Sequence, residues 1–198
     1  MSTGHMAMPA TAGEWKLPSR GRVGMLCLIA AETGIFSIFV VAYLYYIGKS
    51  VTGPFPADVL ELPIFISICL LSSSLTIHWA VRSLEHGRTA RFQLWWFVTI
   101  ALGLIFLVGT AREWHRLIYD HGLTISTNLF GTTYYSLVGL HASHVTAGLL
   151  ALSIVMTLAL TGKVKPEHWE RTEVLSLYWH FVDVVWVIVF TVVYLVGR

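Results

Sequence analysis

The stretch Tyr178-Trp179-His180-Phe181-Val182-Asp183-Val184-Val185-Trp186 places a histidine and an aspartate, three residues apart, inside an apolar run that continues almost to the C-terminus. In a helix over 173–197, residues three apart lie on one face, so His180 and Asp183 would point the same way. A carboxylate at membrane depth is costly, so such residues usually mark a site or a buried contact. We therefore expect other spans to supply polar partners for this face.

The composition is that of an integral membrane protein, because 56% of the 198 residues are hydrophobic and only 12% are charged. The net charge is +2 and no basic patch interleaves with aromatic residues, so we expect no nucleic acid partner. The two cysteines, Cys27 and Cys69, lie in apolar runs without the spacing of metal ligands. We interpret both as packing thiols.

Five apolar stretches are long enough to cross a ~30 Å hydrocarbon core at ~1.5 Å per residue. Strand-length alternation is absent, and open backbone in lipid would lack hydrogen-bond partners, so only helices fit. The predicted fold class is an all-α integral membrane protein, a bundle of five transmembrane helices in residues 23–198 after a polar N-terminal tail at 1–22. The predicted spans are residues 23–47, 59–84, 92–112, 129–160 and 173–197.

Basic residues indicate the orientation, because short cytoplasmic segments carry an excess of lysine and arginine. The tail and the second and fourth loops hold nine of these residues, and the opposite side holds four. This asymmetry predicts a cytoplasmic N-terminus and a C-terminus outside. The nine are Lys16, Arg20, Arg22, Arg82, Arg88, Arg91, Lys163, Lys165 and Arg171, and the four are Lys49, Arg112, Arg116 and Arg198.

The same orientation gives the depth of the polar residues inside the spans. From the cytoplasmic side, Glu32 lies ~14 Å deep, His180 ~12 Å and Asp183 ~17 Å. His141 and His144, on the span that runs the other way, lie ~14 Å and ~10 Å from that side. We therefore predict one intramembrane polar layer of these five residues, in which a Glu32–histidine pair avoids a lone charge in lipid.

The fourth span also carries small residues at four-residue spacing: Gly139, Ser143 and Ala147. Such a stripe permits close helix approach, and the two histidines of this span point roughly the other way. We therefore expect this helix to be central to the bundle.

Three functions fit these patterns. Histidines at matched depth on different helices could ligate a b-type haem, with His141 or His144 opposite His180. Glu32 and Asp183 could carry protons in a transporter, although the chain shows no inverted repeat and no pair of Gly/Pro-broken helices. A matched polar layer without a soluble domain also allows a non-catalytic subunit of a larger membrane enzyme.

The motifs of three spans resemble one family. The stretch 178–186 resembles the most recognisable motif of subunit III of the haem-copper oxidases. Gly139-Leu140-His141-Ala142-Ser143-His144-Val145, with the lead-in Phe130-Gly131-Thr132-Thr133-Tyr134-Tyr135, is similar to the histidine helix of that family. Glu32 with Phe36 and Phe39 resembles its intramembrane glutamate helix, and the resemblance covers nearly the whole chain after the tail.

The resemblance implies a non-catalytic subunit III of a respiratory terminal oxidase, in the five-span form of bacteria. Such a chain spans the inner membrane, flanks the catalytic subunit I among other oxidase subunits, holds phospholipid, and supports proton uptake and stability during turnover. Haem and copper are then expected in the partner subunits and no cofactor in this chain. Similar five-span proteins accompany nitric oxide reductases, which is the alternative.

The resemblance also bears on individual residues. Glu32 becomes the intramembrane acid of the family pattern, or a carboxyl paired to a neighbour, with His141 or His144 as its natural partner. His180 and Asp183 become contacts that fix helix packing or face subunit I.

Two groups lie at the predicted span ends. Glu113-Trp114-His115-Arg116 is interpreted as a solvated helix end at the outer interface. A basic cytoplasmic loop attracts anionic lipid head groups, although a simple positive-inside loop would look the same. Its residues are Arg82, His86, Arg88 and Arg91.

Overall fold

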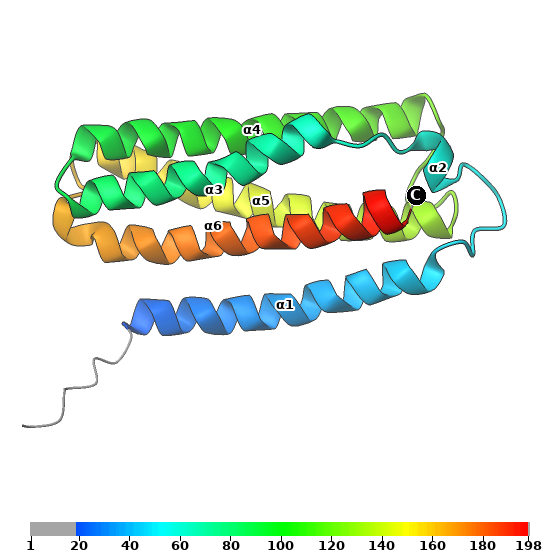
Figure 1. The fold of residues 1–198 in the computed structure, drawn as a ribbon, viewed down its shortest axis with the longest axis horizontal. Coiled ribbons are helices and arrows are strands. Elements are labelled where there is room, and N and C mark those ends of the chain that lie inside the picture. Colours follow the sequence, from blue (N-terminus) through cyan, green and yellow to red (C-terminus); the bar gives the residue numbers. More distant parts are fainter. Residues whose placement is uncertain (1–18, 198) are drawn as a thin grey trace, which may run out of the picture.

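The computed structural model describes residues 19–197, and within that range it contains helices and no strand (Figure 1). Five helical segments are long and apolar enough to cross a membrane, as predicted. They are α1 (Arg20–Tyr46), α3 (Ile64–Glu85), α4 (Thr89–Tyr119), α5 (Leu129–Leu160), and a last segment made of a 3-10 turn (η1, Pro166–His168), α6 (Trp169–Phe190) and a π-helical end (η2, Thr191–Val196). A single helical turn, α2 (Pro56–Val59), lies in the first connection.

The helices are packed as a four-helix core with one peripheral helix. Helix α3 packs on α4 and α6, while α5 packs on α4 and α6 from the other side. Helix α1 lies beside α5 and α6 at the edge of the bundle (Figure 1), and only Phe36 and Tyr43 of this helix are buried. Because α1 buries so little apolar surface, its polar contacts matter more to its position.

Successive spans run in opposite directions, so the start of α1 and the connections α3–α4 and α5–α6 lie at one end of the bundle (Figure 1). This end carries Arg20, Arg82, Arg88, Arg91 and Lys163, and we call it the basic end. The C-terminus lies at the opposite end. That the basic end faces the cytoplasm remains a prediction, and the predicted tail at 1–22 falls largely outside the described residues.

Three completely buried tryptophans form the centre of the core. An indole N–H in an apolar interior needs an acceptor, and each of these finds one on a neighbouring helix. The acceptors are the Leu152 carbonyl for Trp96 (2.9 Å), the Ser73 hydroxyl for Trp179 (2.8 Å) and the Ser67 hydroxyl for Trp186 (3.0 Å). These bonds tie α4 to α5, and α6 to α3, in a fixed rotation.

Close helix approach on α5 occurs at a different glycine from the predicted stripe. Ser143 and Ala147 are exposed, so these two positions of the predicted stripe are not packed within this chain, while an added Cβ at Gly139 would lie 3.4 Å from the Trp114 ring. At Gly148, by contrast, an added Cβ would lie 2.9 Å from the Trp179 ring and 3.2 Å from the Tyr178 ring. The aromatic face of α6 therefore selects the glycine, because large rings need a small residue opposite them.

The helix boundaries differ most from the predicted spans at three places. Helix α3 begins at Ile64 rather than at residue 59, because Pro63 stands at its N-terminal boundary. Helix α4 continues to Tyr119 rather than ending at 112, since the polar groups at 113 and 116 find partners inside the protein. The last helix begins at Trp169, one turn before the predicted start.

Candidate functional site

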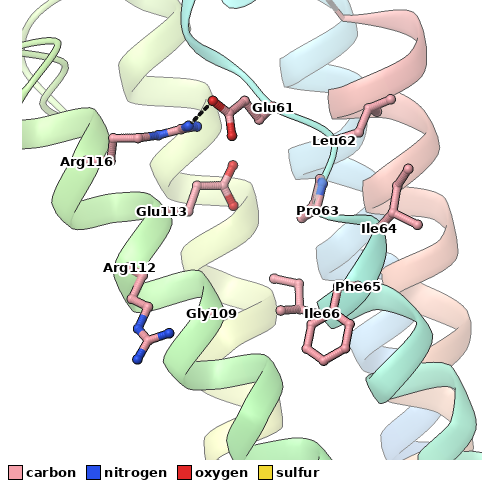
Figure 2. A pocket seen from close by; sticks show the side chains of 10 residues that line it. All are labelled: Glu61, Leu62, Pro63, Ile64, Phe65, Ile66, Gly109, Arg112, Glu113 and Arg116. Atoms are coloured by element: carbon pink, nitrogen blue, oxygen red, sulfur yellow. Dashed lines mark ion pairs between the residues drawn. The ribbon is translucent and has the colours of Figure 1, made fainter.

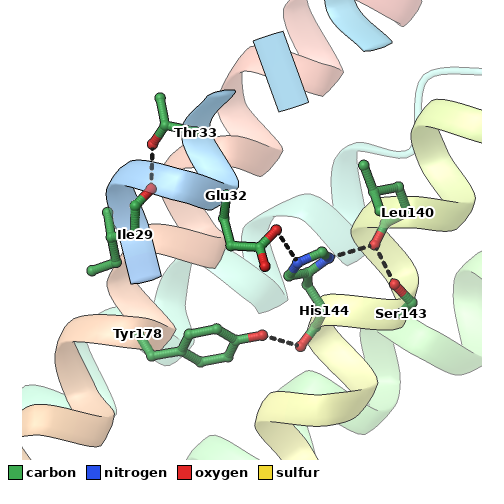
Figure 3. Close-up of polar contacts among 7 residues, drawn as sticks. All are labelled: Ile29, Glu32, Thr33, Leu140, Ser143, His144 and Tyr178. Atoms are coloured by element: carbon green, nitrogen blue, oxygen red, sulfur yellow. Dashed lines mark hydrogen bonds and ion pairs between the residues drawn. The ribbon is translucent and has the colours of Figure 1, made fainter. Parts of the chain in front are cut away.

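Glu32 of α1 and His144 of α5 form the contact between the peripheral helix and the core (Figure 3). The Oε2 atom of Glu32 lies 3.0 Å from Nε2 of His144, and the two side chains are 21% and 15% exposed. The predicted pairing of Glu32 with a histidine is therefore present, and the partner is His144. Both side chains are largely withdrawn from the surface in a part of the bundle where charges lack solvent.

One shared proton explains this contact. The other ring nitrogen of His144, Nδ1, lies 2.8 Å from the Leu140 carbonyl oxygen, which can only accept (Figure 3). Nδ1 therefore carries a hydrogen, and the bond between Nε2 and Oε2 needs one more. Whether that proton sits on Glu32 or His144, the pair has no net charge, which lowers the cost of burying it.

Neighbouring side chains fix the imidazole in this orientation. The Phe36 ring lies 4.9 Å from the His144 ring, between centroids. The Tyr178 hydroxyl of α6 donates to the His144 carbonyl oxygen at 3.1 Å (Figure 3), so α1, α5 and α6 meet at this point. Nearer the basic end, an ion pair between Arg22 and Glu173 of α6 forms a second polar contact between α1 and the core.

His180 and Asp183 belong to a separate group between α6 and α3. The Ser74 hydroxyl donates to Oδ2 of Asp183 and lies 3.0 Å from Nδ1 of His180. The Ser176 hydroxyl lies 3.2 Å from the other ring nitrogen, Nε2. Asp183 is only 3% exposed, and its Oδ1 atom has no hydrogen-bond partner within residues 19–197.

His141 stands apart from both groups. It is completely buried, and neither ring nitrogen finds a hydrogen-bond partner in the described part of the chain. Its ring stacks on Trp186, with centroids 5.0 Å apart, and meets the edge of Phe106 at 5.7 Å. Such a histidine behaves as a neutral aromatic packing residue.

The five residues of the predicted polar layer are thus divided among three environments. Hydrogen bonds join Glu32 to His144 and His180 to Asp183 through Ser74, and no bond links these groups within residues 19–197. Ser74 was missed as a site residue, although the run Ser72-Ser73-Ser74 was a visible polar signal in an apolar span. No group of three His, Cys, Asp or Glu side chains over 19–197 is arranged to hold a metal ion.

A further polar cluster lies at the end opposite the basic end, where we expected a solvated helix terminus. The Tyr194 hydroxyl donates to Oε1 of Glu113 at 2.9 Å, and the Tyr134 hydroxyl lies 3.4 Å from that of Tyr194. Arg116 pairs with Glu61, and both residues line, with Glu113, a pocket of about 320 Å³ (Figure 2). Tyr134 and Tyr194 lie 21 and 81 residues after Glu113, so no local sequence pattern identifies this cluster.

The four residues predicted to contact lipid head groups do gather at one place. They line a pocket of about 400 Å³ at the α3–α4 connection, together with Ser83 and two tryptophans. The tryptophans, Trp79 and Trp95, meet edge to face with centroids 4.8 Å apart. Among the described residues, no carboxylate lines this pocket to neutralise its positive charges.

The comparisons with known proteins agree with this arrangement of motifs. A profile of the family described as cytochrome c oxidase subunit III matches residues 20–198. The chain belongs to the cytochrome c oxidase subunit III family. Proteins named cytochrome c oxidase subunit 3 are similar to it over most of both chains: that of Alkalihalophilus pseudofirmus is 35% identical (88% of this chain, 86% of the relative), that of Corynebacterium diphtheriae 34% (96% and 95%), and that of Synechocystis sp. 39% (90% and 76%).

Membership of the subunit III family confirms the predicted resemblance and does not favour the reductase, cytochrome or transporter alternatives. In a multi-pass subunit III, the Glu32–His144 pair, the Ser74–His180–Asp183 group and His141 are all contacts between transmembrane helices. They join α1 to α5, α3 to α6, and α5 to α6.

Proposed function

We propose that this chain is the non-catalytic subunit III of a bacterial haem-copper terminal oxidase and packs directly on subunit I. The family match over residues 20–198 carries this proposal. Haem and copper reside in the partner subunits, and this chain supports proton uptake and the stability of the enzyme during turnover. The protein lies in the inner membrane with its basic end toward the cytoplasm, because the positive-inside bias orients the helices that way.

The distribution of polar side chains supports a scaffold role. The Glu32–His144 and Ser74–Asp183 hydrogen bonds cross helix interfaces within this chain, while large apolar side chains such as Ile38, Val41 and Phe97 remain exposed. Exposed apolar surface on a membrane helix contacts either lipid or another subunit.

The pocket lined by Arg82, His86, Arg88 and Arg91 is the proposed phospholipid head-group site. Its described lining residues carry positive charge and no carboxylate, and Trp79 and Trp95 have the amphipathic rings that favour the membrane interface. An anionic lipid phosphate would fit between the guanidinium groups, because arginine matches phosphate geometry with paired N–H donors.

Affinity purification from the native host tests the assembly. The oxidase should copurify with an affinity-tagged copy of this chain. Subunit I should be present in a stoichiometric amount, measured by its haem absorption. Photo-crosslinkers at Ile38 on α1 and Phe97 on α4 then distinguish which exposed face contacts subunit I. Recovery of this chain without oxidase subunits, or with a nitric oxide reductase instead, would refute the proposal.

A further inference from the structure

A cavity with several ionisable side chains opens between α3 and α6 at the basic end. It measures about 520 Å³, enough for on the order of ten water molecules. Six of its ten lining residues are ionisable, and cavities with many polar groups hold water rather than staying dry. They are His78, Arg82, Glu85 and His86 from α3, and Glu173 and His180 from α6.

His180 lies at the deep end of this cavity. It is eleven residues from the start of α6, or ~16 Å along the helix axis. Ser176 also lines the cavity, and its hydroxyl lies 3.2 Å from Nε2 of His180. Water in the cavity can therefore reach one nitrogen of this imidazole.

The other nitrogen of His180 leads to a buried carboxylate. Nδ1 lies 3.0 Å from the Ser74 hydroxyl, and that hydroxyl donates to Oδ2 of Asp183. Since the Ser74 hydroxyl has a single hydrogen, Nδ1 must donate to it, so the neutral imidazole carries its hydrogen on Nδ1. Its Nε2 atom, on the cavity side, then accepts a hydrogen bond from the Ser176 hydroxyl, through which a proton can arrive.

We propose that the cavity, His180, Ser74 and Asp183 form a proton-exchange site, through which buried Asp183 is loaded with a proton from the water at the basic end. The geometry carries the inference, because a chain of hydrogen bonds runs without a break from a wide polar cavity to a carboxylate that is 3% exposed. Only residues of this chain take part, so the site does not require contact with subunit I.

The transfer conserves protons at each step. Nε2 takes the hydroxyl proton of Ser176, which regains a proton from water in the cavity, and Nδ1 gives its proton to Ser74. Ser74 then passes its own hydroxyl proton to Oδ2 of Asp183, which becomes a neutral acid. The same steps in reverse release the proton from Asp183 and restore the starting tautomer of His180.

Other charges near the site do not interrupt this route. On α1, Arg22 faces the cavity region but is paired with Glu173. On α5, His141 stacks on Trp186, one turn beyond Asp183, and makes no hydrogen bond with residues 19–197. On α4, the Thr99 hydroxyl bonds Thr76 and is not ionisable.

Infrared spectroscopy of the purified oxidase complex tests the proposal. The carbonyl stretching band of a protonated carboxyl group should be present in the wild-type complex, shift in heavy water, and disappear in Asp183→Asn. The band should persist in Glu32→Gln, whose carboxyl lies at a different helix interface. A spectrum unchanged by Asp183→Asn would mean that Asp183 never holds a proton and would overturn the proposal.

Hydrogen exchange then separates a proton route from a structural contact. His180→Phe should slow the deuterium shift of the Asp183 band by about 100-fold, because a positioned acid–base group speeds proton transfer by ~10²–10⁴-fold. Ser74→Ala, which retains both ionisable groups, should slow it similarly and serves if His180→Phe does not assemble. The matched control His78→Phe removes an imidazole from the cavity wall and should leave the rate within a few-fold. Equal exchange rates in wild type and Ser74→Ala would refute the route.

Discussion

The contact between Glu32 and His144 predicts a measurable coupling between α1 and the core. Replacing Glu32 by leucine leaves Nε2 of His144 without its partner, and replacing His144 by phenylalanine leaves the Glu32 carboxyl alone. Hydrogen bonds between membrane helices contribute ~0.6 kcal/mol on average and up to ~1.7 kcal/mol. We expect a coupling near the upper value, about 1–2 kcal/mol, because this bond is shared by two ionisable groups.

The assay is a double-mutant cycle on the purified oxidase, read as the temperature at which this chain is lost from the complex. For a chain of this size, 1 kcal/mol corresponds to ~2–4 °C, so each single variant should lower the midpoint by ~2–8 °C. The double variant Glu32→Leu/His144→Phe should be more stable than the sum of the single losses, because neither unpaired group remains.

Two further variants test whether the hydrogen bond between Glu32 and His144 accounts for the coupling. Glu32→Gln should cost less than ~0.5 kcal/mol, because its amide N–H can still donate to Nε2 of His144. The control Thr33→Val should show no coupling to His144, since the Thr33 hydroxyl bonds only Ile29 of its own helix. Strict additivity of the Glu32 and His144 losses, within ~0.5 kcal/mol, would refute the assignment of this pair as a tie between α1 and α5.

Three other outcomes follow from the structure. Gly148→Leu should destabilise the bundle by ~1–3 kcal/mol through a clash with Trp179, while Gly34→Ala, which faces open space, should be neutral; thermal midpoints compare the two. His141→Phe should match or exceed the stability of the wild type in the same assay, because it removes two buried nitrogens that find no partner in residues 19–197. The absorption spectrum of this chain, purified without partner subunits, should show no Soret band, whereas a band lost with His180→Ala would identify a haem ligand.

The membrane fold could be predicted from the sequence because the signals for it are local. Length and hydropathy identify a span without reference to any other segment, and the boundary of α5 at 129–160 was predicted as observed. The boundary of α4 was not, because its last two turns depend on partners for Glu113 and Arg116 that come from distant parts of the chain.

The sequence by itself also predicts a shared depth for the intramembrane polar residues, since rise per residue gives height along a helix axis. It does not determine the rotation of each helix about that axis. That rotation places Glu32 against His144, turns His180 and Asp183 toward Ser74, and leaves His141 among aromatic rings. The rotation of each helix depends on how all five spans pack together. Serine hydroxyls bind the buried indoles of Trp179 and Trp186, and Gly148 lies opposite the large rings of α6. Only the tertiary structure therefore decided which of these polar residues meet.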